Sequence, residues 1–250
     1  MASAYAGEAS TPVGAKVSAQ EVFATPEPAA AGISEASITS LEAALHGAAP
    51  TLREEALHAA VSAWESLESR GEPIRPFLTV IDYSLPSTAR RMWVFDLASH
   101  KLLFNELVAH GRNSGENMAE SFSNEDGSLM TSLGAFVTGA SYIGKNGYSL
   151  RLRGIDPDIN DRAESRTIVI HGAPYVSDEF AHKVGRLGRS WGCPAVRPEI
   201  ARQLIDQLKD QTLLYAWHPS LIASEAPALM SVSASHPASI SLGVQSHSIH

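Results

Sequence analysis

The sequence is poor in cysteine, in long apolar runs and in positive charge, and each shortage excludes a class of protein. Only one of its 250 residues is cysteine, so an intramolecular disulfide is impossible. No apolar run approaches the roughly 18 residues that a membrane-spanning helix needs, which predicts no membrane span. With 19 basic and 27 acidic residues the net charge is −8, so a cationic surface for nucleic acid is not indicated.

The two ends of the chain have the composition of poorly ordered segments. Residues 1–33 are rich in Ala, Ser, Pro, Gly and Glu, which bury too little surface to offset chain entropy, and we predict a disordered N-terminal segment. Residues 219–250 are rich in Ser, Ala, His and Pro and predict a tail of little order. The first residues lack the basic and apolar regions of a signal peptide, so none is expected in this chain.

Between the ends, the hydrophobic period changes once. Residues 34–72 predict a helical hairpin, because apolar residues recur at helical spacing and Gly71 and Pro73 end the second helix. Residues 77–218 predict a mostly β domain with peripheral helices, one of them at 198–208. Short β-rich runs at 77–83, 91–96, 101–108, 133–138, 148–153, 167–170 and 212–217 are the expected strands.

One turn carries the clearest chemical signal in the chain. Cys193 stands between Gly192, which lets the backbone turn sharply, and Pro194, which fixes φ. Upstream, His171 ends the apolar run 167–170. A nearby imidazole accepts the proton of a thiol and lowers its pKa, which produces the reactive thiolate. The alternative is a buried structural cysteine and an ordinary strand-end histidine. The glycine and proline on either side of Cys193 and the glycine after His171 favour catalysis.

The pairing of Thr-Ile-Val-Ile-His-Gly with Ser-Trp-Gly-Cys-Pro resembles the signature of the L,D-transpeptidase (YkuD-type) catalytic domain family, most closely its murein L,D-transpeptidase branch. The resemblance covers roughly residues 77–217. It implies a β-sandwich-like fold that acts on peptidoglycan stem peptides in the cell envelope or periplasm, without a cofactor. Many members of the family carry arginine two positions after the cysteine, where this chain has Ala195.

The resemblance also implies roles for particular residues. Cys193 attacks a stem-peptide carbonyl and forms a thioester, His171 transfers the proton, and the Gly172 carbonyl orients the imidazole. The backbone amide of Cys193, with that of Gly192 or another nearby amide, holds the oxyanion, and Ser190 braces the turn. The candidates for substrate binding are Trp191, Arg197, Tyr148 and Tyr175, although core packing or a solvated charge is the simpler role for any one of them.

Other readings of the same residues remain open. A papain-like cell-wall peptidase or amidase normally has its cysteine before its histidine, the reverse of the order here. A non-catalytic wall-binding module with the same fold would need no activated thiol. No His-Glu-X-X-His helix is present, and His182 makes no convincing metal set. The acyl acceptor (a second stem peptide, a protein lysine or water) and the oligomeric state do not follow from the sequence.

Overall fold

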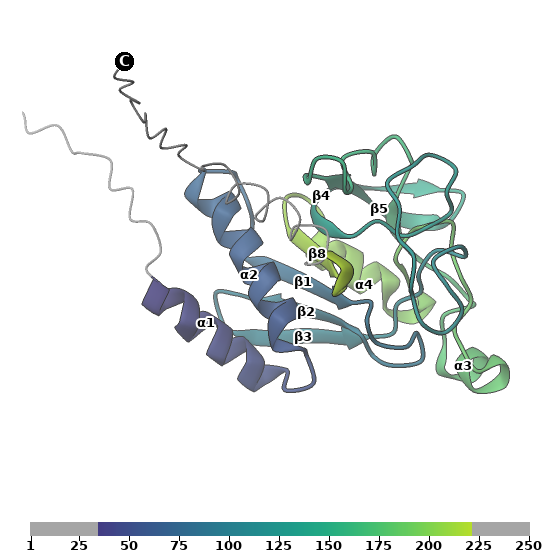
Figure 1. Cartoon of the computed structure of the whole chain (residues 1–250), viewed down its shortest axis with the longest axis horizontal. Helices are drawn as coiled ribbons and strands as arrows, with labels where there is room; N and C mark the ends of the chain where they lie inside the picture. Colours follow the sequence, from purple (N-terminus) through teal and green to yellow (C-terminus); the bar gives the residue numbers. More distant parts are fainter. Residues whose placement is uncertain (1–34, 222–250) are drawn as a thin grey trace, which may run out of the picture. The chain divides into compact units, whose positions relative to one another are not determined.

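A computed structural model describes residues 35–221 of the chain (Figure 1). Residues 1–33, which we predicted to be disordered, and residues 222–250 of the predicted tail lie outside the described residues. In chain order the elements are α1 (Glu35–Ala48), α2 (Glu54–Ser69), β1 (Phe77–Asp82), β2 (Met92–Asp96), β3 (Lys101–Glu106), β4 (Gly134–Gly144), β5 (Gly147–Gly154), β6 (Val169–Gly172), α3 (Asp178–Val184), β7 (Ala195–Val196), α4 (Pro198–Leu208) and β8 (Leu213–Trp217).

The predicted fold class, mostly β with peripheral helices, is confirmed. The strands form one eight-stranded sheet in the order β3-β2-β1-β8-β4-β5-β6-β7, and helices cover both of its faces. Neighbouring strands are antiparallel except for β1 with β8 and β6 with β7, which pair in parallel. The last strand of the chain is therefore inserted at the centre of the sheet, and it connects the β1–β3 and β4–β7 halves.

The central strands are buried on both faces, which explains why they read as continuous apolar runs. Along β8, Leu213 and Trp217 belong to one buried apolar cluster, whereas Leu214 and Ala216 belong to another. The same alternation occurs in β1, where Leu78 and Val80 face one cluster and Ile81 the other, as the two-residue period of a strand requires. Two apolar cores thus share one sheet.

The N-terminal helices cover one of these two faces. Figure 1 shows α2 lying across β1 and β2, and α2 contacts β1 and β8 while α1 contacts β3. Leu57 and Trp64 of α2 pack in the same cluster as Trp93 of β2. Because this cluster joins the helical hairpin to the sheet, the two share a core. No described helix is both long and apolar enough to cross a bilayer.

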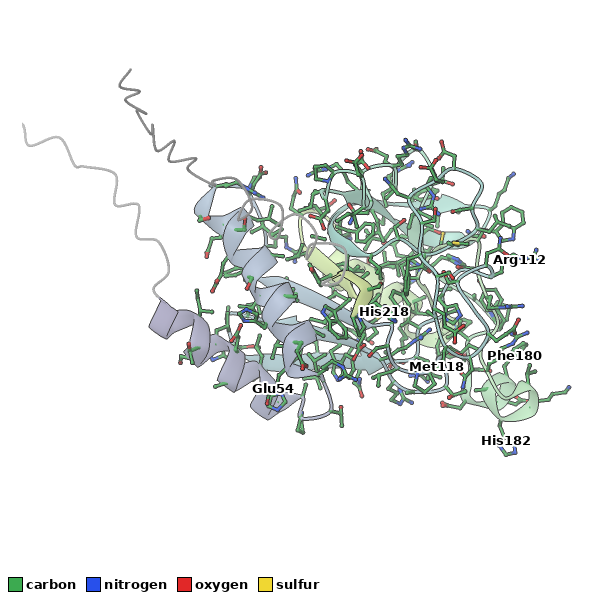
Figure 2. All side chains as sticks on the ribbon, viewed as in Figure 1. Glu54, Arg112, Met118, Phe180, His182 and His218 are labelled. Carbon is green, nitrogen blue, oxygen red and sulfur yellow. The ribbon has the colours of Figure 1, made fainter. Side chains whose placement is uncertain are left out.

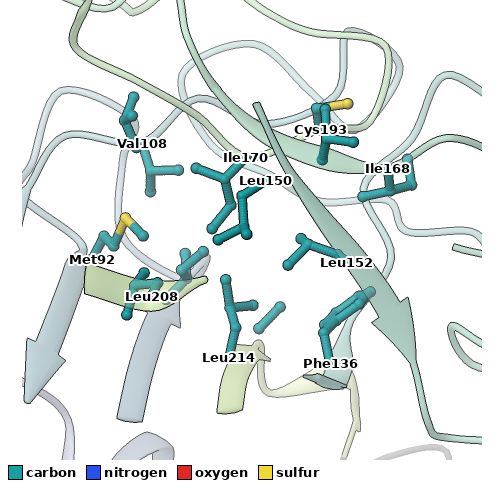
Figure 3. Packing of buried hydrophobic residues seen from close by; sticks show 14 of the residues in the cluster. Met92, Val108, Phe136, Leu150, Leu152, Ile168, Ile170, Cys193, Leu208 and Leu214 are labelled. Atoms are coloured by element: carbon teal, nitrogen blue, oxygen red, sulfur yellow. The ribbon is translucent and has the colours of Figure 1, made fainter. Parts of the chain in front are cut away.

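The opposite face carries α4 and ends at the cysteine turn. The helix packs against β4, β5 and β6 through Leu204, Ile205 and Leu208. Figure 3 shows Cys193 at one end of the cluster, with Leu214 and Phe136 at the other end. The nucleophile candidate is therefore attached directly to the main apolar core.

Candidate active site

Strand pairing brings His171 and the cysteine turn together. His171 lies in β6 and is paired in parallel with Ala195 of β7, so Cys193 comes two residues before the strand that lies beside the histidine. Two segments more than twenty residues apart in the sequence thus reach the same end of adjacent strands. This end of the molecule is remote from α2: Figure 2 shows Arg112, whose backbone N–H donates to Ser190 O, on the side opposite Glu54.

The turn requires glycine at position 192. Its φ is +118°, a region that residues with a Cβ rarely adopt, and a Cβ there would lie 2.6 Å from the carbonyl oxygen of Met130. Ser190 closes the turn from within, because its Oγ donates to Cys193 O (2.6 Å) and accepts from Gly192 N (3.1 Å). The backbone around Cys193 is therefore fixed before any substrate binds.

The His171 imidazole has a defined tautomer. Its Nδ1 lies 3.1 Å from Gly172 O, and since a carbonyl only accepts, Nδ1 carries the proton. The other ring nitrogen, Nε2, is then unprotonated in the neutral ring and is available as a base. Burial lowers the pKa of His171, and the Gly172 carbonyl partly opposes that shift. The imidazole is consequently neutral at neutral pH.

The thiol differs from the expectation of a lowered pKa. Burial raises the pKa of Cys193, and a hydrogen bond from the Val169 backbone and the charge of Arg166 only partly offset it. The residue is 8% exposed, and its thiol donates to Thr167 O (3.8 Å) and makes no hydrogen bond with His171 in the described structure. A preformed thiolate–imidazolium pair is therefore not the resting state: the thiol and the imidazole are both neutral.

Arg166 connects the loop before β4 to the site. Its guanidinium donates to Ser123 O (2.7 Å), Met130 O (2.6 Å) and Ser128 Oγ (3.1 Å), and also to Ser132 Oγ. It also interacts electrostatically with Cys193. A fixed positive charge near the sulfur stabilises negative charge that develops there during reaction.

A pocket of about 570 Å³ opens over the thiol. Both Cys193 and His171 line it, together with Gly127, Leu129, Lys145, Asn146, Arg166, Thr167, Tyr175, Arg189, Ser190 and Trp191. Three lining residues carry a permanent charge, and all three are cationic: Lys145, Arg166 and Arg189. The chain as a whole, in contrast, is acidic. The lining therefore suits an anionic or polar ligand.

The structure brings together most of the residues that the sequence singled out. Trp191, 73% exposed, and Tyr175 line the pocket beside Cys193, and Ser190 lies in its wall. The Gly192 N–H, one of the amides expected to hold an oxyanion, donates to Ser190 Oγ in this structure, and its role in catalysis stays a prediction.

Two predicted substrate contacts lie outside the pocket lining. Arg197 donates to both carboxylate oxygens of the nearly buried Glu106, at 2.8 Å each, and is held as a structural ion pair. The Tyr148 hydroxyl donates to Asp206 Oδ1 (2.6 Å), and Arg202 lies over its ring. Both side chains are satisfied by the protein, so we withdraw them as substrate contacts.

Sequence reasoning missed Lys145 and Arg166. Lys145 lies in the turn between β4 and β5, where the sequence Gly-Lys-Asn-Gly indicated only a turn. Arg166 follows a polar loop and has no motif of its own. Within residues 38–221 no group of three His, Cys, Asp or Glu side chains is arranged to hold a metal ion.

Comparisons with known proteins agree with this fold. The sequence profile of the L,D-transpeptidase catalytic domain family matches residues 48–217, well over half of the chain. The chain therefore belongs to the L,D-transpeptidase catalytic domain family. A search among curated proteins finds no relative of this chain.

The solved structures that match this chain are distant in sequence. One is an L,D-transpeptidase from Mycobacterium smegmatis, 14% identical, with a TM-score of 0.37 and coverage of 57% of this chain and 59% of that one. Another is a variant of the helical cell shape determining protein Pgp2 from Campylobacter jejuni, 14% identical, with a TM-score of 0.38 and coverage of 64% and 55%. The chain thus spans less than two thirds of the length of either structure.

The raised thiol pKa leads to a pH prediction. Alkylation by iodoacetamide follows the thiolate fraction, so the rate at Cys193 is expected to rise with pH around a midpoint above that of the same chain unfolded in denaturant. Since the chain has one cysteine, each adduct reports on this site alone. A midpoint below that of the unfolded chain would contradict the neutral resting pair.

Proposed function

We propose that this protein is a cysteine-dependent L,D-transpeptidase that acts on peptidoglycan stem peptides. The observation that carries the proposal is that Cys193 and His171 line one pocket in a chain of this family. Peptidoglycan as substrate and the cell envelope as location come from the family and belong to the proposal.

The reaction starts from the neutral pair. Cys193 Sγ attacks the carbonyl at the L-centre of the stem's diamino acid, while His171 Nε2 takes the thiol proton. The amide C–N bond then breaks, and the imidazolium returns the proton to the leaving amine of the terminal D-residue. A thioester remains on Cys193. The amine of a second stem, or water, attacks that thioester and regenerates the thiol.

Burial of the site has two opposite effects on charge. It disfavours the thiolate, so attack by the sulfur must be coupled to proton transfer, and it strengthens every interaction with charge that does form. Arg166 near the sulfur supports the attack. The Cys193 backbone N–H has no hydrogen-bond partner among the described residues, which supports its use as the donor for the oxyanion.

Lys145 replaces Arg197 as our candidate for the substrate carboxylate. It is exposed, lines the pocket and makes no hydrogen bond or ion pair with the described residues. Arg189, in contrast, already donates to Gly115 O (2.9 Å) and to Glu116 (2.7 Å). The position two after the cysteine is Ala195, fully buried, and contributes no charge.

The two alternatives from the sequence make different predictions. A papain-like peptidase is disfavoured by the family assignment, which covers both the histidine and the cysteine. A binding module remains the alternative because Cys193 is buried and its pKa is raised. Covalent turnover separates this alternative from an enzyme.

We expect Cys193→Ala to abolish turnover of defined muropeptides and His171→Ala to lower it roughly 10²- to 10⁴-fold, because proton transfer to the base is lost. Products are measured by mass spectrometry, and thermal melting checks that each variant is folded. The exposed His182, on α3 outside the pocket lining, is the matched control, and His182→Ala is expected to act like wild type. Turnover by Cys193→Ala would rule out the mechanism.

A second prediction concerns the substrate carboxylate. Lys145→Gln is expected to raise KM for an anionic stem peptide by up to about fivefold, with little change in kcat, because an exposed ion pair contributes modestly. The exposed Lys183→Gln, away from the pocket, is the control. Amidation of the substrate carboxylate should raise KM for wild type and have no further effect in Lys145→Gln. Equal sensitivity of both proteins to amidation would contradict the assignment.

A further inference from the structure

The peptide group between Gly192 and Cys193 accepts a hydrogen bond from a residue that does not line the pocket. Thr131 is 2% exposed, and its Oγ1 donates to Gly192 O at 3.4 Å. The same hydroxyl oxygen accepts from Gly111 N at 2.9 Å and has a second lone pair for the neighbouring Tyr83 hydroxyl, so its one proton is left for the bond to Gly192. Thr131 N in turn donates to Ser114 Oγ at 2.9 Å.

This bond also determines the direction of the next N–H. In a planar trans peptide the carbonyl and the N–H point in opposite directions, so fixing Gly192 O fixes the Cys193 N–H. The carbonyl is directed to Thr131 behind the turn, and the N–H is directed away from it. Cys193 itself lines the pocket, and its N–H has no partner among the described residues.

Without this bond the peptide group would be easy to rotate. Gly192 has a φ of +118° and no side chain, so few steric barriers oppose a change of its ψ angle. Ser190 holds Cys193 O and Gly192 N, but it makes no bond to Gly192 O. Among the described residues Thr131 alone donates to that carbonyl.

We propose that Thr131 is a positioning residue for the oxyanion donor: it holds Gly192 O and thereby aims the Cys193 N–H at the site where the carbonyl oxygen becomes negative. The inference rests on the proposed function. Since negative charge on that oxygen develops only in the transition state, the contribution of Thr131 belongs to kcat and not to substrate binding.

The test compares two reactions of the same sulfur. Acylation, by a stem peptide or by a carbapenem, passes through an oxyanion, whereas alkylation by iodoacetamide displaces iodide at a saturated carbon and forms none. Thr131→Val removes the hydroxyl and keeps the shape, and Thr131→Ser keeps the hydroxyl. We expect Thr131→Val to lower the acylation rate roughly ten- to a hundredfold, with KM and the alkylation rate within about twofold of wild type. Thr131→Ser should retain acylation.

Thr138→Val is the matched control. Thr138 is also a buried threonine, but its Oγ1 donates to Leu208 O (2.7 Å) and it does not line the pocket, so the ratio of acylation to alkylation should stay at the wild-type value. If Thr131→Val does not fold by thermal melting, Thr131→Ala is measured instead, because the smaller side chain fits the same space.

The outcomes separate this inference from the proposed function. Acylation and alkylation that fall together in Thr131→Val would indicate a purely structural role and overturn the inference. Wild-type acylation by Thr131→Val would overturn it as well, and in both cases the transpeptidase proposal stands. If wild type is acylated by neither the stem peptide nor the carbapenem, the proposed function fails and this inference fails with it.

Discussion

The site depends on the turn around Gly192, which Ser190 holds from within and the loop before β4 holds from outside. Gly192 adopts a backbone conformation that most residues avoid, and the loop before β4 supplies the contacts that maintain it. Thr131 reaches Gly192 across 61 positions of sequence, and Arg166 fixes Met130 O, the atom that a side chain at position 192 would strike. The long polar segment between β3 and β4 is therefore part of the framework of the candidate site, and the sheet supplies the rigid support beneath it.

Burial of the thiol links the fold to the chemistry. Cys193 packs at the end of the main apolar core, which fixes the sulfur in place but raises its pKa. The adjacent His171 is kept neutral by the same effect, with its tautomer set by Gly172 O. The protein thus holds an uncharged pair. In the mechanism that we propose, charges form only during attack, and the Cys193 N–H and Arg166 stabilise them.

Local patterns in the sequence predicted much of the fold and part of the site. The helix at 198–208 was predicted with its observed bounds, because proline and an amphipathic period define it, while β4 runs on to Gly144, beyond the predicted end at residue 138. The motifs around His171 and Cys193 indicated a pair, and the pocket includes both; their roles stay predictions. The ion pair of Arg197 could not be predicted because its partner Glu106 lies 91 positions away. Lys145 and Thr131 were missed because only tertiary structure brings Lys145 to the pocket and Thr131 to the cysteine turn.

The central claim is that Cys193 forms a thioester with a stem peptide. Intact mass spectrometry of the protein after rapid mixing with a tetrapeptide-bearing muropeptide measures this directly, and digestion locates the adduct. We expect one adduct on Cys193, equal in mass to the donor minus the free D-amino acid that is released, and lost on treatment with hydroxylamine. An adduct on any other residue, or release of the D-residue with no adduct in either wild type or a slowed His171→Ala variant, would contradict it.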